Sequence, residues 1–302
     1  EKLVASQPVL LDGGIGTEVM RRGVRWRQHG IEDAPDVIRN IHIDYIKAGA
    51  DILTTHTFNL TKRNFINFFR DEEHMALIGA SGLPARADKL CRSAVSLAKE
   101  ALKETGKIET VPLAGSISPV MHIFRPDLSP PADDCLVHHR ECVKTLSSCG
   151  VDLIFFEGMN NTSEAKSALE ATAGFDLPVW MSFVPGTDGN LLNGESLQSA
   201  ADMARGLGAE VILVSAGRIP MIEKSLPHII NGLPSGAKAI VGKYSPPSWK
   251  PDFYPRFENT DEVSPETYAE QAKGWLDQGI LIIGGSSGTT PEHIRALRKI
   301  IN

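Results

Sequence analysis

Polar side chains end several short apolar runs of this sequence, and their residue types could carry out chemistry. Asp12 ends a run that begins at Val9, and Glu157 ends a run that begins at Val151. A carboxylate at the end of a buried strand loses its hydration, which is costly unless the group is paired or used. Two such carboxylates facing each other would suit a cation, either an amino-acid ammonium or a divalent metal. The other polar residues at such ends are His56, Ser116, Ser182, Ser215, Tyr244, Ser286 and Ser287.

Asp12, Glu157 and His56 are the predicted catalytic residues, because a carboxylate or an imidazole can orient a substrate or move a proton. His56 could equally be a hydrogen-bonded histidine of the core. Two glycines follow Asp12 directly. Since glycine has no Cβ, the amides of Gly13 and Gly14 could closely approach a substrate carboxylate.

A glycine-rich turn near the end of the chain, Gly284–Gly288, follows an apolar run and precedes a predicted helix. Thr290 is a good N-cap residue, and Pro291 at the first helical position loses only an N–H that would have no partner. Ser286 and Ser287 are therefore expected at the mouth of a strand–turn–helix unit, where they could contact a substrate.

This turn permits two further interpretations. It matches the G-x-S-x-G pattern of a nucleophile elbow, but that arrangement needs a later acid and histidine, and only His293 follows. A phosphate site at the helix N-terminus stays open. Lys243, at the end of another apolar run, could form a Schiff base, although a partly solvated structural lysine is the favoured interpretation.

The elements that must position these residues are short runs rich in Val, Ile, Leu or Phe. They lack the alternation of a strand with one solvated face, as strands buried on both faces do. The predicted strands are Val9–Asp12, Asp51–Thr57, Val111–Ser116, Val151–Glu157, Val179–Val184, Val211–Ser215, Ala239–Lys243 and Ile280–Gly284. The predicted helices are Asp36–Ala48, Ala85–Thr105, Asp134–Cys149, Ser163–Thr172, Leu197–Leu207, Ile219–Asn231, Pro265–Gln278 and Pro291–Ile301.

Four glycines punctuate this order, because Gly49, Gly150, Gly208 and Gly279 sit where a glycine would end a helix and lead into the next strand. Repeated strand–helix units within 302 residues predict a TIM (β/α)8 barrel, an α/β fold that forms a single domain over residues 1–302. A doubly wound open sheet is the alternative. It would need a complete G-x-G-x-x-G after the first strand, which this sequence matches only in part.

Composition and charge exclude several classes of partner. The net charge is −6, and no run of Lys and Arg with interleaved aromatics suggests nucleic-acid binding. No apolar stretch reaches the roughly 18–20 residues of a membrane span. No secretory signal is visible, so the cysteines are expected to be reduced thiols in the cytoplasm. Cys135, Cys142 and Cys149 are spaced about 10.5 Å apart along a helix, too far to chelate zinc together, and predict a buried or half-buried stripe.

Three long connections, 117–133, 185–195 and 244–264, follow predicted strands. In a barrel they would lie on the C-terminal face, where active sites form. The third is rich in proline and aromatic residues, including Trp249. It predicts a semi-rigid lid or a subunit contact, and the latter would make the protein a homo-oligomer.

The sequence resembles the homocysteine S-methyltransferase family from about residue 8 to residue 297. The segments that carry the resemblance are Leu10–Gly14, Gly16–Glu18, Ala48–Asp51, Thr54–Phe58, Ala114–Pro119, Val151–Glu157, Glu164–Lys166, Pro178–Phe183 and Gly284–Ile294. The resemblance implies a TIM barrel and a methyl-transfer reaction. It also implies that Asp12 and Glu157 hold the amino group of homocysteine, while amides at the glycine turn hold its carboxylate.

The resemblance further implies a zinc ion, held by three cysteines, that activates the homocysteine thiol. At the matching positions this sequence has Ala216, Ser286 and Ser287. Alanine cannot bind zinc, and serine hydroxyls are poor ligands beside thiolates. Tyr244 matches a strand-seven Tyr-Pro-Asn element of the family, but Ser245 follows it. We therefore predict that no metal is bound, and we interpret the loss as natural, since engineered serines would not explain Ala216.

These observations predict a zinc-independent methyltransferase of the cytoplasm. Its donor would be a small methylated compound, either an onium compound or a methyl ether, and its acceptor need not be homocysteine. Folate could serve as donor or acceptor, and no nucleic acid or membrane is expected as a partner. Aromatic faces can hold an onium group. The predicted substrate-binding residues are Gly13, Gly14, Ser182, Ala216, Tyr244, Trp249, Ser286 and Ser287.

Two other classes of protein stay open. A lyase or hydrolase could use Asp12, His56 and Glu157 as acid–base groups or as ligands of a hard metal, and an essential Lys243 would favour its Schiff-base version. The other class is a protein that binds an amino-acid-like ligand without turnover.

Overall fold

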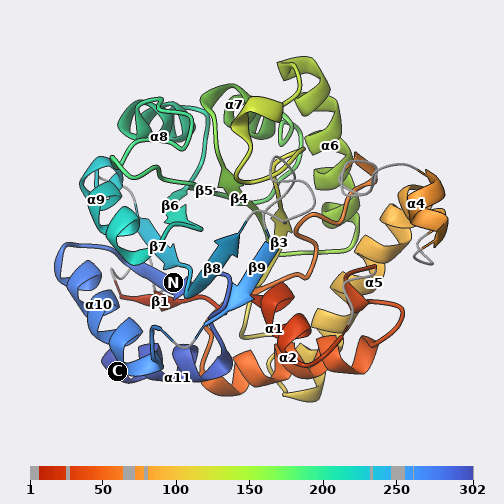
Figure 1. Cartoon of the computed structure of the whole chain (residues 1–302), viewed down its shortest axis with the longest axis horizontal. Coiled ribbons are helices and arrows are strands. Elements are labelled where there is room, and N and C mark those ends of the chain that lie inside the picture. The colour runs from red at the N-terminus through yellow and green to blue at the C-terminus, as the bar shows by residue number, and fades with distance from the viewer. Residues whose placement is uncertain are drawn as a thin grey trace.

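Parallel strands at the centre of the molecule are surrounded by helices (Figure 1). The computed structural model describes residues 7–24, 28–63, 72–77, 81–231, 234–245, 256–260 and 262–301. Within these residues the main sheet has eight strands in the order β1-β10-β7-β6-β5-β4-β3-β2. A parallel bridge from Leu11 to Ile52 links the first strand to the second. The sheet therefore curls as the predicted TIM-like barrel.

The barrel strands match the predicted runs except for the seventh, although the first two are shorter than expected. They are β1 (Val9–Leu10), β2 (Leu53–Thr54), β3 (Leu113–Ile117), β4 (Leu153–Met159), β5 (Val179–Phe183), β6 (Val211–Ser215), β7 (Ser235–Ala239) and β10 (Ile282–Gly285).

The seventh strand is Ser235–Ala239, so the prediction of Ala239–Lys243 is wrong. Its residues are small because the neighbouring strands approach closely. A Cβ on Gly236 would lie 2.7 Å from Leu213 and 2.9 Å from Ile282. A strand of such small residues does not appear as an apolar run in the sequence. The seventh strand was therefore predicted at the more apolar residues that follow it.

All the predicted helices are present, with small differences at their ends. The helices are α1 (Ile15–Arg21), α2 (Pro35–Ala48), α4 (Glu72–Leu77), α5 (Leu83–Glu104), α6 (Ala132–Ser148), α7 (Thr162–Glu170), α8 (Leu197–Gly206), α9 (Ile219–Ile229), α10 (Pro265–Asp277) and α11 (Pro291–Ile300). Short 3-10 turns lie at η1 (Gln28–Gly30) and η2 (Pro126–Leu128). The glycines predicted to end helices, Gly49, Gly150, Gly208 and Gly279, all have positive φ.

Local hydrogen bonds explain why α11 begins where it does. Thr290 is its N-cap and Pro291 its first residue, as predicted. The Nδ1 atom of His293 lies 3.2 Å from the Thr290 nitrogen, and its Nε2 lies 3.2 Å from the Val263 carbonyl oxygen. His293 thus helps to cap the helix and binds the segment before α10, which leaves it no part in a nucleophile elbow.

Two apolar clusters hold the layers together. The larger one lies between the sheet and the helices and includes Cys91 of α5. Cys142 and Cys149 pack against it from α6 and its C-terminal end, and Cys135 is buried, so the predicted helix stripe is confirmed. The smaller cluster fills the barrel with Val9, Leu11, Ile52, Ala114, Leu153, Phe155, Trp180, Val211, Leu213 and Ile282.

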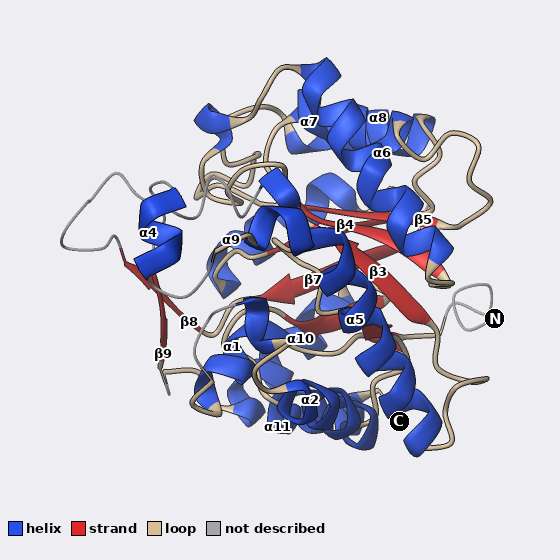
Figure 2. Ribbon diagram, turned by 90° about the vertical axis from the view of Figure 1, so that its right-hand side faces the viewer, coloured by secondary structure: helices blue, strands red, loops and turns tan. Residues whose placement is uncertain are grey.

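Two antiparallel strands, β8 (Gly242–Ser245) and β9 (Arg256–Asn259), stand apart from the barrel on the same side as α4 (Figure 2). Residues 246–255, including Trp249, lie outside the described residues, so the predicted lid stays a prediction. Among the described helices, none combines the length and the apolar character that crossing a membrane requires.

Candidate active site

A polar layer caps the apolar interior of the barrel at the C-terminal ends of the strands. Side chains of a strand alternate between its faces, so residues two apart share a face. Phe155 belongs to the cluster inside the barrel, and Glu157 therefore points inward as well. The same relation holds for Ser116 after Ala114, Ser182 after Trp180 and Ser215 after Leu213. The structure thus brings these predicted strand-end residues together.

Glu157 is bound by two side chains from other strands. The Ser116 hydroxyl donates to Oε2 at 2.5 Å, and the Lys238 ammonium donates to Oε1 at 2.7 Å. Lys238 belongs to β7, is 3% exposed, and has its Nζ 5.3 Å from the centre of the Phe155 ring. The cation that Glu157 binds is therefore a residue of the protein itself.

Lys238 is the site residue that sequence reasoning missed. The predicted seventh strand begins one residue after Lys238 and ends at Lys243, so Lys243 was the candidate lysine of that strand. Lys243 lies on β8, where its side chain is exposed. One sequence feature could have identified Lys238: it lies among the small residues Gly236, Ala237 and Ala239. Small residues are typical of a strand that packs tightly inside a barrel.

Asp12 is fully buried and tied to β2. Its Oδ2 accepts hydrogen bonds from the Thr54 N–H at 2.7 Å and from the Thr54 hydroxyl at 2.9 Å. Burial raises the pKa of Asp12 to about 6, and the charge of Lys238 and the bonds from Thr54 keep it from rising further. Glu157 is also close enough to act on this pKa. Asp12 and Glu157 therefore belong to one electrostatic group, together with Lys238.

Ser182 supports the main chain beside Glu157. The pairing of β4 with β5 shifts register between Phe156 and Met159, and the Gly158 N–H at this shift donates to the Ser182 hydroxyl at 2.8 Å. The Ser215 hydroxyl lies 2.7 Å from that of Ser182. Hydroxyls of two further strands thus hold the irregular end of β4 in place.

The glycines after Asp12 allow two turns to pack against each other. A Cβ on Gly14 would lie 2.5 Å from the Ser286 carbonyl oxygen, and one on Gly13 would lie 2.7 Å from the Tyr45 hydroxyl. The Gly14 N–H donates to the Thr289 hydroxyl at 3.1 Å, so this amide is engaged within the protein. The Gly13 N–H has no acceptor among the described residues and is the amide left for a ligand.

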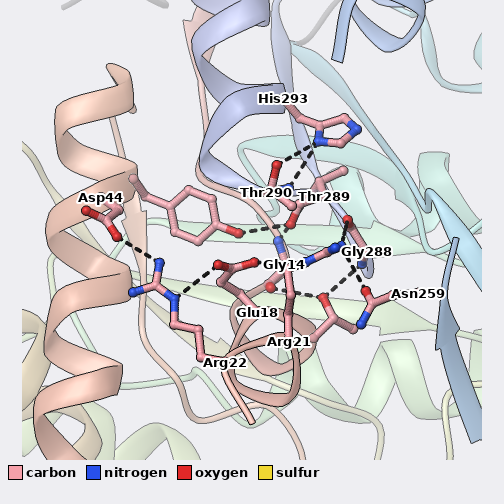
Figure 3. Close-up of polar contacts among 12 residues, drawn as sticks. Gly14, Glu18, Arg21, Arg22, Asp44, Asn259, Gly288, Thr289, Thr290 and His293 are labelled. Atoms are coloured by element: carbon pink, nitrogen blue, oxygen red, sulfur yellow. Dashed lines mark hydrogen bonds and ion pairs between the residues drawn. The ribbon is translucent and has the colours of Figure 1, made fainter. Parts of the chain in front are cut away.

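Polar contacts of α1 fix the turn that carries Ser286 and Ser287 (Figure 3). Arg21 donates to the Gly288 carbonyl oxygen at 3.2 Å and to the Asn259 side chain of β9 at 3.0 Å. Arg22 joins Glu18 to Asp44 of α2, at 3.1 and 2.7 Å. The turn after β10, the helix after β1 and the strand β9 are thereby tied to one another.

The residues at the three positions implied to hold zinc do not suit that metal. The Ala216 side chain has no atom that could bind a metal, and it packs with Ile123, Val184 and Ile240 in an apolar cluster at the strand ends. The Ser287 hydroxyl lies 2.8 Å from the Tyr244 hydroxyl. Within the described ranges no three His, Cys, Asp or Glu side chains are grouped as metal ligands would be. Serine is a weak zinc ligand, and thiolates or imidazoles are what such a site needs.

Tyr244 lies on β8, not at the end of the seventh barrel strand as predicted. Its ring makes edge-to-face contacts with Phe124 and Phe257, at centroid distances of 4.7 and 5.1 Å. Burial raises its pKa, against the effect of the hydrogen bond with Ser287. Tyr244 thus packs against two other rings, and the onium-binding role predicted for it stays a prediction. Trp249, the other predicted onium-binding residue, lies outside the described residues.

His56 lies among histidines. Its Nε2 is 2.9 Å from the His29 carbonyl oxygen, and the His29 Nε2 is 2.9 Å from the carbonyl oxygen of Phe58. Burial lowers the pKa of His56 to about 4, so its ring is neutral at pH 7. These contacts show how His56 joins two segments near the barrel mouth, and its predicted catalytic role stays a prediction.

Comparisons with known proteins agree with this architecture over the whole chain. The family model described as homocysteine S-methyltransferase matches residues 9–301. Homocysteine S-methyltransferase 2 of Arabidopsis thaliana is 27% identical, with 96% of this chain and 92% of that protein covered. Selenocysteine methyltransferase of Astragalus bisulcatus is 26% identical, with 99% and 94% covered. The metallated form of the homocysteine methyltransferase MmuM from Escherichia coli shares the fold, with a TM-score of 0.77, 23% identity and 99% and 98% coverage. The chain therefore belongs to the homocysteine S-methyltransferase family, a family of methyltransferase enzymes.

Proposed function

We propose that this enzyme transfers a methyl group between small molecules without a zinc-bound thiolate. The observation that carries the proposal is the set of side chains at Ala216, Ser286 and Ser287, which supply no thiolate or imidazole. Zinc lowers the pKa of a bound thiol and thereby creates the nucleophile. Without that help, a free thiol with an ordinary pKa is a poor acceptor at neutral pH.

The donor must then bring more of the activation. In an onium compound the methyl group is bonded to a positively charged atom that leaves as a neutral group, so the donor is already activated. The rings of Tyr244, Phe124 and Phe257 form a cluster in which the Tyr244 hydroxyl contacts Ser287, and aromatic faces attract onium groups. We therefore propose an onium compound or a methyl ether as donor, with folate as a further candidate donor or acceptor.

The polar layer supplies the groups that orient a substrate and move a proton. A pKa of about 6 lets Asp12 exchange a proton near neutral pH, as an acid or base must. Glu157 is held at both oxygens by Ser116 and Lys238, which fixes its position for contact with a substrate.

A metal analysis run beside a methyl-transfer assay tests this proposal. The purified chain is expected to hold far less than one zinc per molecule. It should transfer methyl groups from a panel of onium compounds and methyl ethers at a rate that a chelator does not change. Near-stoichiometric zinc, with homocysteine methylation that a chelator abolishes, would overturn the proposal.

A variant that restores the three cysteines is the matched control. Ala216→Cys, Ser286→Cys and Ser287→Cys together should bind about one zinc per chain, because thiolates are the ligands this geometry lacks. Zinc uptake by this variant and none by the unchanged chain would attribute the difference to these three side chains. Equal zinc uptake by both would contradict the proposal.

A further inference from the structure

Lys238 places a positive charge inside the barrel where the two buried carboxylates would otherwise attract one from a ligand. Its ammonium contacts Glu157 directly at 2.7 Å and acts on Asp12 through space. Its side chain is 4% exposed and that of Glu157 is 15% exposed, so bulk water screens this group only weakly. Glu157 therefore already has its cation, and Asp12 lies within range of the same charge.

The same ammonium has hydrogen-bonding capacity to spare. A lysine ammonium has three N–H donors. Among the described residues, Glu157 is the only hydrogen-bond acceptor for Lys238 Nζ, and the Phe155 ring lies nearby. Two donors thus have no acceptor within the described part of the chain, and buried donors without a partner are costly. An oxygen atom of a bound molecule would satisfy them.

We propose that Lys238 takes the place of a substrate's ammonium, so that the site binds a small acid with an uncharged oxygen, a hydroxyl or a carbonyl, where an α-amino acid has its amino group. A second ammonium about 4 Å from Lys238 would be disfavoured by roughly a thousandfold at an effective dielectric constant near 20. Asp12 and Glu157 attract such a group and offset much of this repulsion, although both already accept hydrogen bonds from the protein. We expect a net preference of about tenfold for the oxygen compound, roughly 1.4 kcal/mol.

This inference rests on the proposed function only in that it describes the substrate of the same site. It concerns binding and does not require turnover. If the enzyme proves to use zinc, the proposed function fails while the selectivity of binding can still be measured. If the selectivity is absent, this inference fails whether or not methyl transfer is found.

Calorimetric titration with matched compounds tests the inference. Methionine is compared with its α-hydroxy and α-keto analogues, and homocysteine with its α-hydroxy analogue. The unchanged enzyme should bind the oxygen compounds about tenfold more tightly than the amino acids. Lys238→Met removes the charge and should reverse this order. Comparable affinity for both members of each pair, or no measurable binding of either member, would overturn the inference.

Three further experiments keep the test decisive. Lys103→Met removes an exposed lysine from α5 and should leave the order of affinities unchanged. Lys238→Met leaves Glu157 without its cation, so the double variant Lys238→Met with Glu157→Gln is used if the single variant does not fold. The ratio of its affinities for the oxygen compound and the amino acid should fall close to one.

Reduction with borohydride in the presence of the α-keto acid should leave Lys238 unmodified. A covalent adduct on Lys238 would show a Schiff base and contradict the role proposed here.

Discussion

Mild acid should destabilise this protein, because the fold buries neutral histidines. Burial lowers the pKa of His29 and of His42 to about 3 and that of His56 to about 4. In the unfolded chain these groups titrate near 6.5. Below that pH the unfolded chain binds protons that the folded chain cannot, so stability is lost as the pH falls from 6.5 towards 4. Above pH 6.5 both states are neutral at these sites, and the histidines contribute no pH dependence.

The size of the loss follows from these pKa values. At pH 5 an unfolded histidine gains about 2 kcal/mol from protonation, so the three together cost the fold about 6 kcal/mol. Asp12 acts in the opposite direction, because its raised pKa of about 6 lets the folded chain bind a proton first. Binding of this proton raises the free energy of unfolding by about 1.4 kcal/mol at pH 5. The pKa values of His122 and His138 are also lowered, to about 4, and add to the loss. We expect a net loss of at least about 4 kcal/mol.

Urea denaturation at pH 7.5 and pH 5.0 measures this loss. His42 provides the sharpest variant, because neither of its ring nitrogens has a hydrogen-bond partner in the part of the chain that the structure describes. His42→Leu should reduce the loss between the two pH values by about 2 kcal/mol. Asp12→Asn should increase it by about 1.4 kcal/mol, since the compensating proton is then absent. A free energy of unfolding that changes by less than about 1 kcal/mol between the two pH values, or an unchanged loss in His42→Leu, would refute this reasoning.

Two further changes test the packing of the site. Lys238→Met should reduce the free energy of unfolding by about 3 kcal/mol, because it leaves the Glu157 charge buried and unpaired. Adding Glu157→Gln should recover at least about 1 kcal/mol in the same urea measurement, and no recovery would mean that the lysine contributes through its packing alone. Gly14→Ala should lower the melting temperature and reduce stability by about 1–3 kcal/mol, since its Cβ would meet the Ser286 carbonyl oxygen at 2.5 Å. An unchanged melting temperature would show that the two turns can separate at no cost.

Much of the fold could be predicted because its signals are local. The start of α11 at Thr290 and Pro291 and the glycine after α2 depend on contacts within a few residues along the chain. The buried strands show as apolar runs for the same reason. The seventh strand has no such run, because Gly236 is required by the side chains of Leu213 and Ile282, which are distant in sequence.

The candidate site was predictable only in part. Asp12 and Glu157 stand out because a carboxylate that ends an apolar run is rare without a purpose. Other contacts of the site have no comparable signal in the sequence. The Gly14 amide meets Thr289 from the far end of the chain, and His56 meets the carbonyl oxygen of His29. Neither contact has a sequence pattern, because both depend on how two turns pack in space.

The sequence by itself determined the repeated strand–helix order, the ends of the helices and the polar residues at the mouth of the barrel. Periodicity and capping need only neighbours along the chain, so one sequence is enough to see them. The tertiary structure alone decided which cation the buried carboxylates hold. Lys238 and Glu157 are 81 residues apart, on β7 and β4, and only closure of the barrel brings their side chains to 2.7 Å. The free energy of a buried charge depends on what surrounds it in space, and that is set by the folded barrel.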